Sequence, residues 1–295
     1  MEATSKHEKP RKVRFVCISD THGHAPGEGY TLPKGDVLIH AGDLTNQGSR
    51  SELEKAARWL EKADFAVKLV VAGNHDLSLD PDYRLKHGQG WTVKPDDVEQ
   101  CRALIENIPG VMYLQHKPAE VHLPGKEISF SVFGSPYSQE SLKQNWAFQY
   151  STEEVDALWR QIPSSTDVLV THTPPAGHVD ASKHWQDGGC PSLRDVLGQV
   201  NPLLHVCGHC HEGRGAEMIH WPVERHEGVS VTQLEDPGVG NKKQSLFDLT
   251  RVASNPGSSA GTAVVNASIM AKSWGQGSKA FNKPIVVDVD ISGRV

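Results

Sequence analysis

The stretch VCGHCHE, residues 206–212, places two histidines two positions apart directly after an apolar run. Side chains at positions i and i+2 of an extended segment leave the same face, so His209 and His211 can address one small volume just beyond a strand. The same residues contain Cys207-x-x-Cys210, the spacing of thioredoxin-type redox motifs. The stretch therefore predicts either a metal site built on imidazoles or a dithiol site.

Length, composition and charge limit the class of protein. With 295 residues the chain can form one large domain or two ordinary domains and bury a substantial core. The formal net charge of -6 offers no broad basic surface for a nucleic-acid backbone, so we expect no duplex nucleic acid as a partner. A small-molecule substrate fits this composition better. No pattern in the sequence indicates an oligomeric state.

The start of the chain and the cysteines indicate a cellular location. Residues 1–12 are polar and charged and precede no small-residue cleavage site. No stretch approaches the roughly 20 apolar residues of a membrane span. Five cysteines, an odd number without framework spacing, suit a reducing compartment. We therefore expect a cytoplasmic protein that does not associate with membranes.

The first part of the chain alternates strands with a helix. The run KVRFVCIS at 12–19 and the apolar runs at 37–40 and 66–72 have the length and β-branched content of strands. A capping box at 51–54 predicts a helix that ends near residue 62. Polar side chains follow each strand at its carboxyl end, where α/β folds place their sites.

The rest of the chain continues this pattern and adds a hairpin. The predicted elements are a helix at 95–108, a hairpin of 119–123 with 127–133, a helix from a second capping box at 151–154 to 161, a strand at 167–171, a helix opened by Pro191, a strand at 203–207 and final strands at 263–269 and 284–291. Residues 222–259 are polar and rich in Gly, Ser and Asn, which predicts an insertion or lid. We expect a flexible tail at 1–11 and a single domain over 12–295.

The residues at the strand ends share one kind of chemistry, because they offer only carboxylate, imidazole and amide groups. They are Asp20, His22, Asp43, Asn74, His75, His172, His209 and His211. A mixed nitrogen and oxygen donor set suits Mn, Fe, Zn or Co. The set is larger than one metal needs, and two metals about 3.5 to 4 Å apart that share a carboxylate would account for it.

Five blocks of sequence follow one another in order along the chain. They are Asp20-x-His22, Gly42-Asp43, Gly73-Asn74-His75-Asp76, His172 and Gly208-His209-x-His211. Placed at strand ends in this order, they resemble the calcineurin-like metallophosphoesterases. Within that superfamily the chain is most similar to the metallophosphoesterase-domain-containing branch related to class III cyclic nucleotide phosphodiesterases. The stretches that carry this closer similarity are SDTH at 19–22, GDLT at 42–45, THTPP at 171–175, HEG at 211–213 and VNAS at 265–268.

The resemblance implies a fold, a metal centre and a reaction. The fold is an α/β sandwich of the αββα type, with two mixed sheets flanked by helices. The reaction is hydrolysis of a phosphoester by in-line attack of a metal-bound hydroxide, most readily of a phosphodiester in a small molecule such as a cyclic nucleotide. The cofactors are two divalent transition-metal ions, with Mn favoured. One metal would be held by Asp20, His22, Asp43 and His211, and the other by Asp43, Asn74, His172 and His209, so that Asp43 bridges.

The resemblance also assigns roles beyond metal binding. His75 is the family's histidine that binds no metal, and it would protonate the leaving oxygen as a general acid. Some animal relatives in the branch carry glycine at the position of His209, which removes one ligand. From its place in the loop after His211, Arg214 is predicted to meet a phosphate oxygen. His24 is expected near the rim of the metal site.

The sequence also has features of other kinds of site and fold. A dithiol site needs Cys207 at the start of a helix, but Gly213 and Gly215 follow soon after and disfavour one. An amidohydrolase barrel is a second alternative. This fold would leave the block at 73–76 without a role, and it would need eight regular βα units. A metallo-β-lactamase-like site needs a further Asp-His where Ala25-Pro26 stands. On the favoured fold, a phosphomonoesterase, a protein phosphatase or a non-catalytic scaffold are the alternatives.

Overall fold

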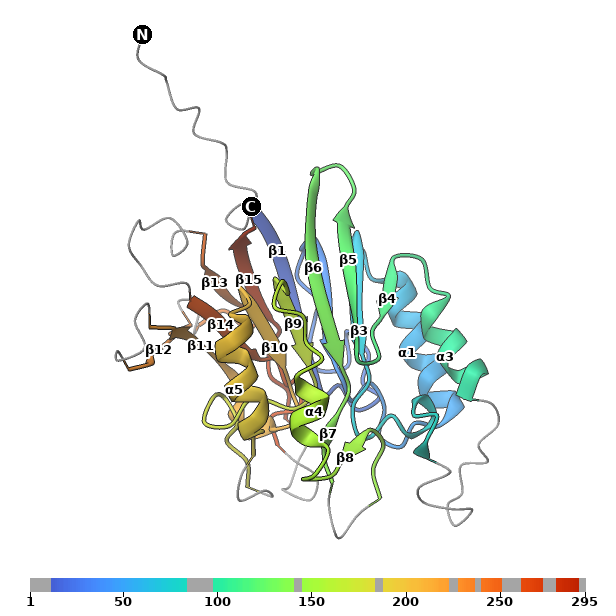
Figure 1. Ribbon diagram of the computed structural model, residues 1–295. Helices are drawn as coiled ribbons and strands as arrows, with labels where there is room; N and C mark the ends of the chain where they lie inside the picture. Colours follow the sequence, from blue (N-terminus) through green and yellow to red (C-terminus); the bar gives the residue numbers. More distant parts are fainter. Residues whose placement is uncertain are drawn as a thin grey trace.

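A computed structural model describes residues 12–83, 98–140, 145–183, 188–222, 228–236, 240–250, 261–272 and 280–291. Two sheets form its centre (Figure 1). The six-stranded sheet has the order β13 (Ser245–Asp248), β15 (Ile285–Asp290), β1 (Lys12–Ile18), β2 (Val37–Ala41), β3 (Val67–Val71), β4 (Val111–Tyr113). The seven-stranded sheet has the order β12 (Ser230–Gln233), β11 (Gly215–His220), β14 (Gly261–Asn266), β10 (Leu204–Cys207), β9 (Val168–Thr171), β6 (Ile128–Ser135), β5 (Lys117–Leu123). Both sheets are mixed, since β1 pairs parallel with β2 and antiparallel with β15.

The two sheets pack face to face around a shared core. Successive side chains of strand β1 point to opposite faces of its sheet. Val13, Phe15 and Cys17 share one face and lie in the core between the two sheets. The ring of Phe15 meets that of Phe130 on β6 edge-on, with the centroids 5.6 Å apart. Val16 faces the opposite side and packs in a second core under the helices.

Helices cover the outer face of each sheet. Helices α1 (Arg50–Lys62) and α3 (Val98–Glu106) lie side by side over the six-stranded sheet, and α4 (Val155–Trp159) and α5 (Pro191–Val200) lie over the seven-stranded sheet (Figure 1). The expected αββα sandwich is therefore confirmed. Among the described residues no helix is both long and apolar enough to cross a bilayer.

Several predicted element boundaries need correction. The first capping box is Ser49 with Glu52, two positions before the predicted pair, because the Ser49 hydroxyl accepts the backbone N–H of Glu52. The second predicted box does not cap a helix: Ser151 donates both its N–H and its hydroxyl to Glu154 instead, and α4 ends at Trp159. The predicted start of the helix at 95–108 lies outside the described residues, as does the tail at 1–11.

The segment predicted as an insertion or lid contributes to both sheets. Its described residues contain β12, which pairs antiparallel with β11, and β13, which pairs parallel with β15. The sequence pattern of these two strands is weak because both lie at the edge of a sheet. The four side chains of β12 are all exposed, so this strand has no apolar face. The role of 222–259 as a lid stays a prediction.

The parallel strands direct their carboxyl ends to one edge of the sandwich, where the two sheets are joined by hydrogen bonds. His172, after β9, makes a hydrogen bond from Nδ1 to the carbonyl oxygen of Ala41 at the end of β2, at 2.9 Å. Ser19, after β1, donates its N–H to the carbonyl of Ala267 after β14. These contacts fix the relative positions of strand ends that come from opposite sheets.

Candidate metal centre

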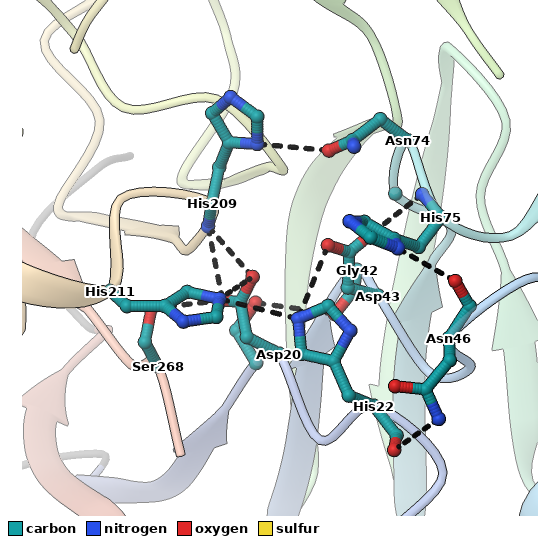
Figure 2. Close-up of polar contacts among 12 residues, drawn as sticks. Asp20, His22, Gly42, Asp43, Asn46, Asn74, His75, His209, His211 and Ser268 are labelled. Atoms are coloured by element: carbon teal, nitrogen blue, oxygen red, sulfur yellow. Dashed lines mark hydrogen bonds and ion pairs between the residues drawn. The ribbon is translucent and has the colours of Figure 1, made fainter. Parts of the chain in front are cut away.

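All eight predicted site residues lie at the joined carboxyl ends. Figure 2 shows seven of them, from both sheets, with their side chains around one small volume. Asp20 and His22 follow β1, Asp43 follows β2, Asn74 and His75 follow β3, His172 follows β9, and His209 and His211 follow β10.

Four of these residues hold the backbone in the left-handed region. The φ angles are 51° at Asp20, 42° at His22, 55° at Asp43 and 66° at His209. Residues other than glycine seldom adopt this conformation, and the strain persists where surrounding structure enforces it. These four residues all belong to the predicted metal centre. Strained backbone of this kind clusters at functional sites.

Three glycines that precede predicted ligands allow a close approach. A Cβ at Gly42 would lie 2.3 Å from His172 Nδ1, and one at Gly73 would lie 2.3 Å from Asp43 Oδ1. A Cβ at Gly208 would lie 2.3 Å from Asp20 Oδ2. Glycine is therefore needed before the ligand in these blocks because the neighbouring side chain occupies the space of any larger residue.

The first group of donors consists of Asp20, His22, Asp43 and His211. The Nε2 atoms of His22 and His211 lie 3.2 Å apart, and His211 Nε2 lies 3.3 Å from Asp20 Oδ1. His22 Nε2 lies 3.7 Å from Asp43 Oδ2. These four residues match the set that the resemblance implied for one metal.

The second group surrounds the side-chain oxygen of Asn74. Nε2 of His172 and Nδ1 of His209 each lie 2.9 Å from Asn74 Oδ1. His172 Nε2 also lies 3.4 Å from Oδ1 of Asp43. Asp43 thus directs Oδ1 to this group and Oδ2 to the first, as a bridging ligand would.

The protonation pattern of the second group fits a cation. A carbonyl oxygen can only accept a hydrogen bond, so His172 donates from Nδ1 to Ala41. Nε2 faces the lone pairs of Asn74 Oδ1, so this nitrogen holds a proton when no metal is bound and can give its lone pair to a metal ion that replaces the proton. The Ala41 contact also fixes the tautomer, as partners of metal-binding histidines commonly do.

The pKa shifts of the buried groups show that the two carboxylates of the centre favour positive charge beside them. Burial opposes the ionisation of Asp20, but the hydrogen bond and charge of His211 outweigh it and hold the pKa of Asp20 below its usual range. Burial likewise opposes ionisation of Asp43, yet His172 keeps its pKa well below normal. Against the effect of burial, Asp43 raises the pKa of His172 to about 9, and Asp20 raises that of His211 to about 9.

Two other ligand histidines, His22 and His209, stay neutral. Burial lowers the pKa of His22 to about 3, and burial followed by the charge of His172 lowers that of His209 to about 3. Neutral imidazoles are the form that binds metal ions. The donor set therefore fits two divalent cations that share Asp43, and these cations would take the place of the protons that the carboxylates favour on His172 and His211.

Asp76, the last residue of the block at 73–76, has a role that the sequence did not reveal. Its carboxylate is fully buried and accepts the backbone N–H groups of Leu44, Thr45 and Gly73, together with the Thr45 hydroxyl. Burial and the charge of Asp43 raise the pKa of Asp76 to about 6. Asp76 thereby joins the loops that carry two of the metal ligands.

Replacing Asp76 by alanine is expected to lower the free energy of unfolding by roughly 3 kcal/mol or more, since three buried N–H groups lose their acceptor at about 1–3 kcal/mol each. Urea denaturation of the metal-free protein measures this. Asp76→Asn keeps one acceptor oxygen and should lose less, and Asp195→Ala on the exposed surface of α5 is the control. An Asp76→Ala protein as stable as the control would contradict the joining role.

Ser268 is a second residue whose role the sequence did not reveal. Its hydroxyl lies 2.9 Å from Asp20 Oδ2, an oxygen that also accepts the N–H of His209 at 3.0 Å. Asp20 Oδ1 is thereby directed towards His211. The neighbouring Asn266 was predicted to be structural rather than glycosylated, and it is buried and donates to the carbonyl of Cys210 at 2.8 Å.

The dithiol alternative is excluded by the surroundings of the two cysteines. Cys207 and Cys210 are both buried free thiols. Burial raises the pKa of each thiol well above its usual value, which makes it a poor nucleophile. Cys210 directs its sulfur away from the histidines, to the carbonyl of Gly188 at 3.0 Å. Packing is the role of both cysteines, as predicted.

Arg214 lies in a different polar group from the one predicted. Its guanidinium donates to the hydroxyl of Ser245 at 3.0 Å and to the carbonyl of Lys283 at 2.7 Å. Ser245 and Lys283 both contact Asp236. These contacts tie the start of β11 to β13 and to the approach of β15. A contact between Arg214 and phosphate stays a prediction.

The fold and the donor set define an α/β sandwich with a centre suited to two divalent metal ions. The sequence pattern of the family described as calcineurin-like phosphoesterases matches residues 13–213, and the chain belongs to this family. The fold class and the family predicted from the five blocks are thereby confirmed.

Two curated relatives are similar to this chain in sequence. The chain is 40% identical over 221 residues to the probable rhamnogalacturonate lyase C of Emericella nidulans, a match that covers 74% of this chain and 19% of that protein. It is 36% identical over 223 residues to metallophosphoesterase domain-containing protein 1 of Homo sapiens, covering 71% of this chain and 64% of that protein. The chain therefore spans less than two thirds of the length of either relative.

Among solved structures, purple acid phosphatase PPD1 from yellow lupin seeds matches with a TM-score of 0.39 and 12% sequence identity, over 96% of this chain and 55% of that chain.

Proposed function

We propose that the chain hydrolyses phosphodiesters of small molecules, such as cyclic nucleotides, at a centre that binds two divalent metal ions, with manganese favoured. The observation that carries this proposal is the convergence of two donor groups on the two oxygens of Asp43. Membership of the calcineurin-like phosphoesterases supports the reaction class. The substrate class rests on similarity to the metallophosphoesterase-domain-containing branch. The five buried thiols fit a reducing compartment, and we place the activity in the cytoplasm.

The residues of the centre have separable tasks. Asp20, His22 and His211 would hold one ion, Asn74, His172 and His209 the other, and Asp43 both. Bound together, the two ions would supply an acidified water as nucleophile and positive charge for the phosphoryl oxygens. Ser268 and the Ala41 carbonyl orient ligands in their binding form.

His75 is the residue that we assign to proton transfer. Its backbone N–H donates to Asp43 Oδ1 at 2.9 Å, which ties it to the centre. Its ring donates from Nδ1 to the carbonyl of Asn46 at 2.7 Å, as Figure 2 shows. In the imidazolium form, Nε2 is then the nitrogen that delivers a proton to the leaving oxygen and is left with a lone pair. One ring nitrogen of His75 also lies within 4.8 Å of ligand atoms of His22 and Asp43, so a ligand role is the competing assignment.

The experiment that tests the proposed function compares substrates side by side. The purified protein, stripped of metal with a chelator and reloaded with Mn, is assayed on 2′,3′- and 3′,5′-cyclic nucleotides, an aryl phosphodiester and an aryl phosphomonoester. We expect the diesters to be hydrolysed faster than the monoester, and we expect no hydrolysis without metal. Preferred hydrolysis of the monoester would move the assignment to a phosphomonoesterase or protein phosphatase. Failure to bind any transition metal at micromolar concentration would leave the scaffold alternative.

Replacing His209 by glycine is expected to remove one ligand of the second ion while leaving the first group intact. Glycine tolerates the left-handed backbone at this position, so the loop should keep its shape. We expect the metal content per chain to fall towards one and turnover to fall with it. Metal analysis after dialysis and the diester assay measure both. Unchanged metal content would contradict His209 as a ligand. His220→Gly, on β11, is the control.

A further inference from the structure

The indole of Trp146 lies against the imidazole of His75. The two ring centroids are 4.1 Å apart and the planes are inclined by 35°, which is a tilted contact and not an edge-on one. On another side, His22 meets the His75 ring edge-on at 4.7 Å. Together with the hydrogen bond from Nδ1 to Asn46, these contacts restrain the ring on three sides.

The turn that carries Trp146 is fastened to the loop that carries His75. Ala147 donates its N–H to the carbonyl oxygen of Asn74 at 3.0 Å. The residue after Trp146 is therefore hydrogen-bonded to the residue before His75. Phe148 donates its N–H to Asp80 Oδ2 at 2.7 Å, further along the same loop. The turn and the loop therefore hold the two rings in one geometry.

The backbone of this turn is strained at Phe148. This residue is fully buried and has a φ angle of 52°, a conformation that is rare for a bulky side chain and costs on the order of 1–3 kcal/mol. Strain of this kind clusters at functional sites. Here the strained residue lies two positions after Trp146.

We propose that Trp146 is a positioning residue that holds the His75 ring where Nε2 can protonate the leaving oxygen. The inference rests on the proposed function. Trp146 acts through His75 and not through the metal ions, so its removal should lower turnover without changing metal content. Its effect should depend on how much protonation the leaving group needs.

The test compares Trp146→Leu with the wild type on two esters of thymidine 5′-phosphate, the phenyl and the 4-nitrophenyl diester. Phenolate is the more basic leaving group and needs the proton more. We expect kcat for the phenyl ester to fall roughly 10- to 100-fold, the range that a small misplacement of a catalytic group can cause. The nitrophenyl ester should lose much less, KM for both should stay unchanged, and Mn content should remain that of the wild type.

Further variants separate positioning from a structural role. Trp146→Phe keeps an aromatic face over His75 and should restore most of the turnover. In the double variant His75→Ala, Trp146→Leu, we expect turnover equal to that of His75→Ala alone, because residues that act as a unit are not additive. Equal losses on both esters, a raised KM with unchanged kcat, or additive losses would overturn the inference.

A readout without turnover keeps the inference testable apart from the proposed function. In the zinc-loaded protein, the indole of Trp146 should shift the ring protons of His75 upfield in the NMR spectrum. Trp146→Leu should abolish this shift and Trp146→Phe should keep part of it. If the wild type hydrolyses neither ester, the proposed function fails. If it hydrolyses both but the shift does not depend on residue 146, the inference about Trp146 fails.

Discussion

Replacing Asp43 by asparagine should abolish phosphoesterase activity and the binding of two metal ions together. Among the described residues, Asp43 is the one whose two oxygens face both donor groups: Oδ1 lies 3.4 Å from His172 Nε2 and Oδ2 lies 3.7 Å from His22 Nε2. Asparagine keeps one acceptor oxygen for the N–H of His75 and tolerates the left-handed backbone, so the fold should persist. We expect turnover to fall by more than about 10³-fold, beyond the loss of a single transition-state contact.

Thermal unfolding provides a second measurement of the same variant. In the wild type, Mn at 100 times its dissociation constant should stabilise the fold by about 2.7 kcal/mol, because it binds only the folded state. The Asp43→Asn protein should gain little from Mn. A variant stabilised by Mn as much as the Asp195→Asn control would contradict the bridging role.

The individual strands were predictable because their signals are local, and the packing of two sheets into a sandwich was implied by the family resemblance of the five blocks. Strand β1 alternates between two cores, and the hairpin of β5 and β6 is marked by its turn at Pro124-Gly125. The weaker predictions concern edge strands. Strands β12 and β13 have no long apolar run because each is paired on one side only. Their position depends on partners far away in the chain.

The metal ligands were predictable for a different reason, since each follows a strand and the carboxyl ends of parallel strands meet at one edge. Partners that lie far away in sequence were not predictable. Ser268 reaches Asp20 across 248 positions, and Trp146 reaches His75 through a turn with no motif of its own. The same holds for Arg214, whose partners Ser245 and Lys283 belong to later strands and only the fold brings them together.

Replacing His75 by alanine should leave both metal ions in place and remove most of the turnover. The ligand atoms of both donor groups belong to other residues, and the backbone N–H that His75 donates to Asp43 survives the change. A general acid contributes about 10²–10⁴-fold to a rate, and we expect a loss within that range on the phenyl diester of thymidine 5′-phosphate. The 4-nitrophenyl diester should lose less, because its leaving oxygen needs little protonation.

Metal content decides between the two assignments of His75. If this histidine donates a proton, the alanine variant keeps two Mn ions per chain and loses turnover in proportion to the basicity of the leaving group. If it is a ligand, as its proximity to His22 and Asp43 also permits, the variant loses metal and turnover on both esters equally. His122→Ala, on the exposed face of β5, is the matched control because it removes an imidazole that bonds only to Ser129 among the described residues. Full activity of His75→Ala on the phenyl ester would refute the general-acid role and would also remove the basis for positioning by Trp146.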